Sequence, residues 1–306
     1  MSVAALAIAC AALVGVDPPV DRALGYLARE VPRWSVENRC YSCHHNGDAA
    51  RALHAVARAG LPVPPLALAD TTAWLSRPEA WDNNGGDGPF SDKRLARLQF
   101  AATLASAAMV DRGPLQRAAR RLAEDQADDG SWQVDPTDAI GSPTTLGRPL
   151  ATHLARETLR AADLAAHRPA IDRAGAWLAA RPLRTTLDAS AALLADVGVD
   201  GAPISHLLKS QGEAGGWGPH PGTPPEPFDT AIAVLALARV VDRPGVRDAI
   251  RRARDHLVAA QLPDGSWPET TRPAGSESFA QRLSTAGWAL QALLAARDAT
   301  LPEADR

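Results

Sequence analysis

The fold is decided by a seven-residue loop that occurs three times: QADDGSW at 126–132, QLPDGSW at 261–267 and, in a looser copy, QGEAGGW at 211–217. Each copy begins with Gln, ends with Trp and has Gly two places before the Trp. Gly permits a tight turn with positive φ, a Gln side chain can bond loose backbone groups at helix ends, and an indole can cover a helix junction. A structural role is therefore predicted for Gln126, Trp132, Gln211, Trp217, Gln261 and Trp267.

Outward from these loops, hydrophobic periodicity divides the chain into six helix–loop–helix pairs. The expected helices are 20–30 with 48–59, 65–75 with 93–108, 114–125 with 149–162, 170–180 with 185–196, 202–210 with 228–241, and 245–260 with 281–297. The first helix of each pair is amphipathic, whereas the second helices contain stretches that are apolar on every face, such as 231–238. A helix that is apolar all round must be buried. The pattern therefore predicts an all-α, (α/α)6 toroid with six inner and six outer helices.

The loops and helix pairs resemble the squalene–hopene cyclase and protein prenyltransferase superfamily over residues 20–297. The resemblance implies an α/α toroid of the terpenoid cyclase type, but the residues behind its activities are absent. Cyclases carry Asp-x-Asp-Asp-Thr-Ala, whose middle Asp protonates the substrate. The nearest match here is EPFDTA at 226–231, which has Phe228 at that position. We expect Asp229 and Thr230 to cap the following helix. The zinc site of the prenyltransferases needs a later cysteine, and none follows Cys43.

Composition and charge limit the possible partners and the cellular location of the protein. The chain has 306 residues and a formal net charge of -3, which gives no reason to expect nucleic acid as a partner. Its apolar start is too short to span a bilayer and predicts a signal peptide at 1–16, with export to the periplasm or beyond the cell. A single domain is expected over 17–300, followed by a disordered tail at 301–306, with no transmembrane span.

The sequence CYSCHH at 40–45 has the spacing of covalent haem attachment, within an expected loop at 31–47. Cys40 and Cys43 would form the thioethers of a haem c, and His44 would bind its iron as the proximal ligand. His153 or His220 would be the sixth ligand, because both are expected on the same face of the toroid. The prediction is an exported haem protein that acts in electron transfer, with a redox partner protein, or as a haem-dependent oxidoreductase.

Two other functions stay open at this stage. One is a divergent squalene cyclase or prenyltransferase-like protein that lacks the usual catalytic Asp motif and binds a lipid-like small molecule. The other is a non-catalytic lipid- or partner-binding scaffold, in which the Cys and His residues hold zinc or copper, or the two thiols form a disulfide. No acid–base pair stands out in the sequence, so enzymatic activity and catalytic residues are left open.

Overall fold

The computed structural model describes residues 17–84, 93–107, 109–134, 139–197, 201–270, 272 and 278–300. The signal peptide expected at 1–16 and the tail expected at 301–306 lie outside the described residues. Within the described ranges the chain is helical and contains no β-strand.

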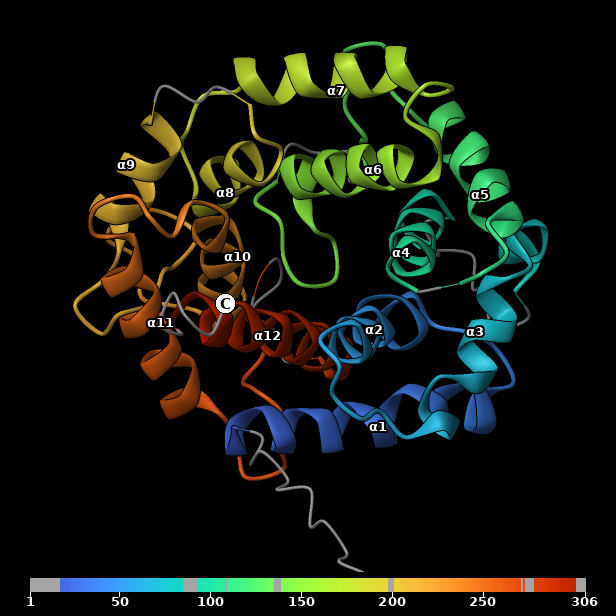
Figure 1. The fold of residues 1–306 in the computed structure, drawn as a ribbon, viewed down its shortest axis with the longest axis horizontal. Helices are drawn as coiled ribbons and strands as arrows, with labels where there is room; N and C mark the ends of the chain where they lie inside the picture. The colour runs from blue at the N-terminus through green and yellow to red at the C-terminus, as the bar shows by residue number, and fades with distance from the viewer. Residues whose placement is uncertain are drawn as a thin grey trace, which may run out of the picture.

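The helices form two concentric rings (Figure 1). The outer ring consists of α1 (Pro18–Asn38), α3 (Ala69–Leu75), α5 (Gly113–Glu124), α7 (Arg168–Ala180), α9 (Ala202–Ser210) and α11 (Val246–Ala260). The inner ring consists of α2 (Ala50–Arg58), α4 (Lys93–Ser106), α6 (Gly147–Asp163), α8 (Thr186–Leu194), α10 (Pro227–Leu237) and α12 (Phe279–Thr300). Shorter turns are η1 (Cys43–Ala49), η2 (Pro65–Ala67), η3 (Pro78–Asn83) and η4 (Ala238–Val240). The predicted all-α, (α/α)6 toroid is confirmed.

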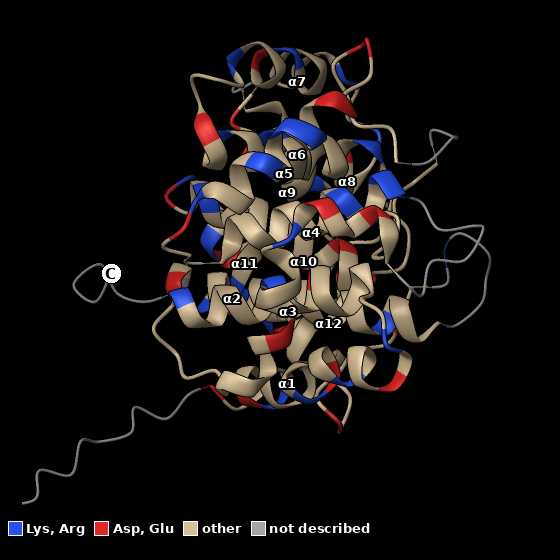
Figure 2. Ribbon diagram, turned by 90° about the vertical axis from the view of Figure 1, so that its right-hand side faces the viewer, with Lys and Arg blue, Asp and Glu red and all other residues tan. Residues whose placement is uncertain are grey.

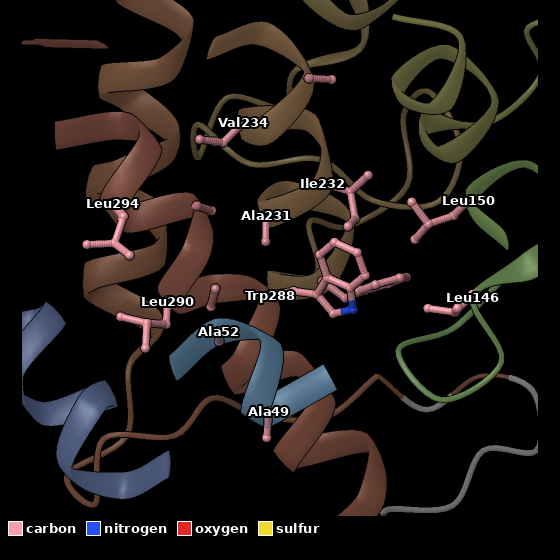
Figure 3. Packing of buried hydrophobic residues seen from close by; sticks show 14 of the residues in the cluster. Ala49, Ala52, Leu146, Leu150, Ala231, Ile232, Val234, Trp288, Leu290 and Leu294 are labelled. Atoms are coloured by element: carbon pink, nitrogen blue, oxygen red, sulfur yellow. The ribbon is translucent and has the colours of Figure 1, made fainter. Parts of the chain in front are cut away.

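The inner helices form the core because their apolar residues face neighbours on all sides. Helix α10 is the clearest case: of its eleven residues, nine are buried. Proline occupies one of the first two positions of α10 and of four outer helices, where the missing N–H has no intrahelical partner to lose. In the centre of the ring, the Trp288 indole of α12 lies between Ile232 of α10 and Leu146 and Leu150 at the start of α6 (Figure 3).

The repeated loops join neighbouring outer helices. The Gln211 amide donates to the Gly215 carbonyl of its own loop at 2.6 Å and to the Ala249 carbonyl of α11 at 2.9 Å. The Trp217 indole N–H donates at 2.8 Å to the Leu207 carbonyl in the last turn of α9, a group that the helix leaves unpaired. The copy at 126–132 makes the same three bonds, to Gly130, Ala170 and Leu122.

The third copy closes the ring. The Gln261 amide donates at 2.9 Å to the Pro19 carbonyl of α1, at a separation of 242 residues in the chain. It also donates to Gly265 at 3.2 Å, and Trp267 donates to Leu257 at 2.7 Å. The last helix pair is thus joined to the first by the bonds that join pairs consecutive in the chain.

The segment expected as a loop at 31–47 is mostly helical. Helix α1 continues through Pro32 to Asn38, and it ends where Arg39 adopts a left-handed φ of 56°. After a short connection, Cys43–Ala49 forms a π-helical turn that leads into α2. Its start is fixed by Ser42, whose hydroxyl accepts the His44 N–H at 3.2 Å.

Acidic and basic residues are interspersed along the helices in the view of Figure 2. None of the described helices combines the length and hydropathy that a bilayer-spanning helix requires.

Candidate functional site

Two cavities occupy opposite ends of the toroid. One is lined by residues at the start of the inner helices, including Leu95 of α4 and Phe279 of α12. The other is lined by residues near their C-terminal ends, including Arg58 of α2, Ala161 of α6 and Leu194 of α8. We call them the N-terminal and the C-terminal cavity.

The N-terminal cavity has a volume of about 650 Å³ and an aromatic wall. That wall comes from Trp34 of α1, Tyr41, Trp81 of η3, Phe100 of α4 and Phe279 of α12. Trp81 and Phe100 lie 5.5 Å apart between ring centroids, so part of the wall is a continuous aromatic surface. A cavity of this size and lining is suited to an apolar chain and, through the ring faces, to positive charge on it.

The Cys-x-x-Cys-His-His segment lines the same cavity. The Cys40 thiol accepts a hydrogen bond from the Trp34 indole at 3.3 Å, and no disulfide joins Cys40 to Cys43. The two nitrogens of the His44 ring face Cys43 Sγ, at 3.6 Å, and Ser284 Oγ, at 3.4 Å. Burial of the ring lowers the pKa of His44 to about 4, so the imidazole is neutral at pH 7.

A buried polar cluster lies behind His44. Ser284 also bonds to the carboxyl group of Asp48, which accepts from Gln99 Nε2 at 2.8 Å and lies 3.4 Å from Arg51 Nη2. Burial raises the pKa of Asp48 to about 6, while the Arg51 charge and the hydrogen bonds from Ser284 and Gln99 oppose the rise. Arg51 in turn lines the C-terminal cavity, so the cluster connects the walls of the two cavities.

Asp229, in the first turn of α10, is a second buried carboxyl group. Its Oδ2 accepts from Arg272 Nη2 at 2.8 Å, and Arg272 also reaches Glu226 at 3.3 Å. Its Oδ1 has no hydrogen-bond partner among the described residues. Burial raises the pKa of Asp229 to about 7, against the lowering effect of Arg272.

The helix-cap role expected for Asp229 and Thr230 is not what the structure shows, because α10 has no side-chain cap bond. The Thr230 hydroxyl instead accepts from the Trp217 backbone N–H at 2.9 Å and so holds the repeat loop.

The histidines proposed as a sixth iron ligand do not meet His44 in one cavity. His153 of α6 lines the C-terminal cavity instead. His220 lines neither cavity, and its Nδ1 lies 3.3 Å from the Arg184 carbonyl.

No protein-family profile matches the chain. Among curated proteins it is 31% identical over 257 residues to a drimenyl diphosphate synthase from Streptantibioticus cattleyicolor, a match that covers 74% of this chain and 45% of that protein. A drimenyl diphosphate synthase from Streptomyces showdoensis is 41% identical over 73 residues, 13% of its length. The chain therefore matches less than half the length of these curated relatives.

Solved structures show the same fold. The type II terpene cyclase MstE from Scytonema has a TM-score of 0.57 at 14% identity, with 92% of this chain and all of that chain covered. The ent-copalyl diphosphate synthase from Streptomyces platensis has a TM-score of 0.53 at 19% identity, with 82% of this chain and 50% of that one covered. A variant of MstE was solved with its substrate, geranylgeranyl dihydroxybenzoate. The relatives and structural neighbours are terpene cyclases, and the toroid is of the terpene cyclase type.

The predicted haem c function is wrong. The relatives are terpene cyclases rather than haem proteins, and no redox partner is indicated. The zinc or copper alternative is wrong as well: within the described ranges, no group of three or more His, Cys, Asp or Glu side chains is placed to hold a metal ion.

Sequence reasoning missed most of the aromatic wall. The available signal was the set of tryptophans outside the repeat loops, which the loop pattern does not explain. Trp34 and Trp81 are two of these, and both face the N-terminal cavity.

Proposed function

We propose that this protein is a divergent terpenoid cyclase-like protein that holds the hydrocarbon chain of an isoprenoid in the N-terminal cavity. The observation that carries the proposal is the aromatic wall around about 650 Å³. Five aromatic side chains from separate segments supply apolar surface for the chain, and their ring faces can stabilise a carbocation. The sequence relationship to drimenyl diphosphate synthases supports the same class of ligand.

A cyclisation started by protonation needs a neutral carboxylic acid. Asp229 is suited to this, because its pKa of about 7 leaves a large fraction protonated at neutral pH and its Oδ1 has no partner in the described structure. In the proposed step, the Oδ1 proton adds to the CH carbon of the terminal alkene and leaves a tertiary carbocation at its dimethyl carbon. The remaining alkenes attack in turn, the last cation loses a proton to water, and Asp229 takes up a proton from water, so the overall reaction is an isomerisation. Asp229 is fully buried and is not among the residues that line the N-terminal cavity, so groups packed around it, including its partner Arg272, must move aside for the substrate to reach the carboxyl group.

A non-catalytic isoprenoid-binding scaffold is the second candidate. It is favoured by Phe228, which stands where the related cyclases have their acid and packs edge-on against Trp288 at 6.2 Å. It is also favoured by the complete burial of Asp229.

The test separates binding from turnover. Linear C15 and C20 prenyl diphosphates and a linear C30 hydrocarbon are added to the purified protein, binding is followed by tryptophan fluorescence, and products are analysed by mass spectrometry. A cyclase gives cyclised isomers, and Asp229→Asn lowers turnover by about 100-fold or more while binding is kept. Glu226→Gln is the matched control, since it removes the other carboxylate bonded to Arg272 and leaves the acid in place.

Each outcome decides between the candidates. If the ligands bind, Phe100→Ala weakens the binding and no cyclised product forms, the protein is a binding scaffold. Phe228→Asp would raise turnover only in a cyclase. Absence of binding for all three ligands would contradict the proposal as a whole.

A further inference from the structure

The C-terminal cavity has a volume of about 490 Å³ and a lining rich in arginine. Arg58 and Arg239 are exposed and stand at its rim, near the ends of α2 and α10. The buried side chains of Arg51, His153 and Trp288 form its inner wall. The cavity therefore has two cationic side chains at the surface and a third one inside.

Three buried donors in this inner wall have no partner among the described residues. They are Arg51 Nε, His153 Nδ1 and Trp288 Nε1. The Arg51 guanidinium lies over the Trp288 ring, 3.9 Å from its centroid, so two of the three atoms belong to stacked groups. Buried polar groups in folded proteins normally have hydrogen-bond partners, and one acceptor bound in this cavity would satisfy all three.

The positive charge of the cavity is incompletely balanced. Asp48 lies 3.4 Å from Arg51 Nη2, but burial raises the pKa of this carboxyl group to about 6. Glu157 also lines the cavity, but its carboxylate is already paired with Arg156 at 2.9 Å and with Arg160 at 3.7 Å. In the part of the chain that the structure describes, Arg239 forms no ion pair.

The lowered pKa of His153 agrees with the excess of positive charge in the C-terminal cavity. Burial lowers the pKa of His153 to about 3, and the charges of Arg156, Arg239 and Arg51 add to the effect. The imidazole is thus neutral at pH 7 and can donate one N–H without adding a fourth charge. Arg58 has a more ordinary role, since it donates to the Ser106 carbonyl at the end of α4.

We infer that the C-terminal cavity is an oxyanion site that binds a phosphate or diphosphate group. Such a group accepts several hydrogen bonds at once and carries the multiple negative charge that three arginines would balance. The inner wall would supply N–H donors from Arg51, His153 and Trp288, and the rim would add the charges of Arg58 and Arg239. The site lies at the opposite end of the toroid from the aromatic cavity and does not depend on the function proposed there.

Phosphate binding is tested by titration of the full chain with inorganic phosphate, diphosphate and sulfate at constant ionic strength, followed by calorimetry. We expect diphosphate to bind at submillimolar concentration and to raise the melting temperature. Arg239→Gln should weaken the binding about 5- to 10-fold, and Arg51→Gln should weaken it more. Because Arg51 is buried beside Asp48, its variant can fail to fold, and Arg239→Gln keeps the test decisive.

Arg251→Gln is the matched control, because Arg251 lies on the exposed side of α11 and pairs with Asp248 at 2.5 Å. Equal loss of affinity in this variant and in Arg239→Gln, or no binding at millimolar diphosphate, would overturn the inference. A C5 prenyl diphosphate separates the two sources of the group. If the prenyl diphosphate binds more tightly than inorganic diphosphate and Arg239→Gln abolishes this binding, the ligand is a phosphate ester. If the two bind equally, the ligand is the free ion.

Discussion

At the scale of single residues, the glycine two places before each loop tryptophan is constrained in both backbone conformation and contact. The backbone φ angles of Gly130, Gly215 and Gly265 are +94°, +85° and +96°, a region that residues other than Gly rarely adopt. Each also lies against the backbone of the next outer helix. At Gly215, an added Cβ would come within 2.5 Å of the Arg252 carbonyl oxygen. Conformation and contact therefore both require glycine here.

Gly215→Ala should accordingly lower the free energy of unfolding by about 3 kcal/mol, because backbone strain and a displaced helix contribute together. Gly222→Ala is the matched control: its φ is +80° and an added Cβ would meet nothing within 4 Å. We expect a loss of only about 1 kcal/mol there, from the positive φ alone. Chemical denaturation of both variants checks this, and equal losses would show that the contact with α11 is unimportant.

At the scale of helices and loops, each repeat tryptophan completes the helix that precedes it. Trp217→Phe keeps most of the buried ring but removes the shorter of the two hydrogen bonds to the Leu207 carbonyl, which keeps only the Ser210 hydroxyl at 3.3 Å. We expect a loss of about 2 kcal/mol in the free energy of unfolding. Trp177→Phe is the control, since the half-buried Trp177 indole donates to an exposed carboxylate, Asp129, at 3.2 Å. That loss should stay below about 1 kcal/mol, and a larger one than in Trp217→Phe would refute the role given to the loop.

Most helices could be predicted from the sequence because their signals are local. Prolines at helix starts and wholly apolar stretches placed nearly every boundary within a few residues, as in α9 and α10. The exception is the end of α1, because the helix expected at 20–30 continues through Pro32 to Asn38. The π-helical turn at Cys43–Ala49 has no recognisable sequence pattern, and the Cys-x-x-Cys-His spacing that overlaps it predicts haem attachment instead.

The two cavities could not be predicted, because their walls are assembled from distant segments. Arg51, His153 and Trp288 come from three inner helices separated by more than a hundred residues each in the chain. Neither spacing nor composition brings them together. Only the closure of the ring does so.

At the scale of the whole molecule, burial of ionisable groups makes stability depend on pH. Four buried histidines have pKa values lowered from about 6.5 to between about 3 and about 4, mainly by burial: His44, His45, His54 and His153. Near pH 5 they bind protons only in the unfolded chain. Asp48 and Asp229 act in the opposite sense, because burial raises their pKa values and they bind protons in the folded state. Unfolding near pH 5 should therefore take up about two protons net.

The free energy of unfolding should thus fall by about 3 kcal/mol per pH unit as the pH drops from 6 to 4.5. Denaturation at a series of pH values measures the slope. Asp229 releases a proton on unfolding, and Asp229→Asn removes this release. Net proton uptake then rises to about three, so the slope should steepen to about 4 kcal/mol per pH unit. A stability that is flat across this range would contradict the burial of the neutral histidines.

The bond from Gln261 to Pro19 repeats the bonds from Gln126 to Ala170 and from Gln211 to Ala249. The contact between the last and the first helix pair is therefore of the same kind as contacts between pairs that follow one another in the chain. The order of the helix pairs around the ring therefore depends on contacts between adjacent pairs and not on where the chain starts. In a circular permutant, a linker would join α12 to α1, and the new termini would lie in a connection between two other helix pairs. We expect this permutant to fold into the same toroid.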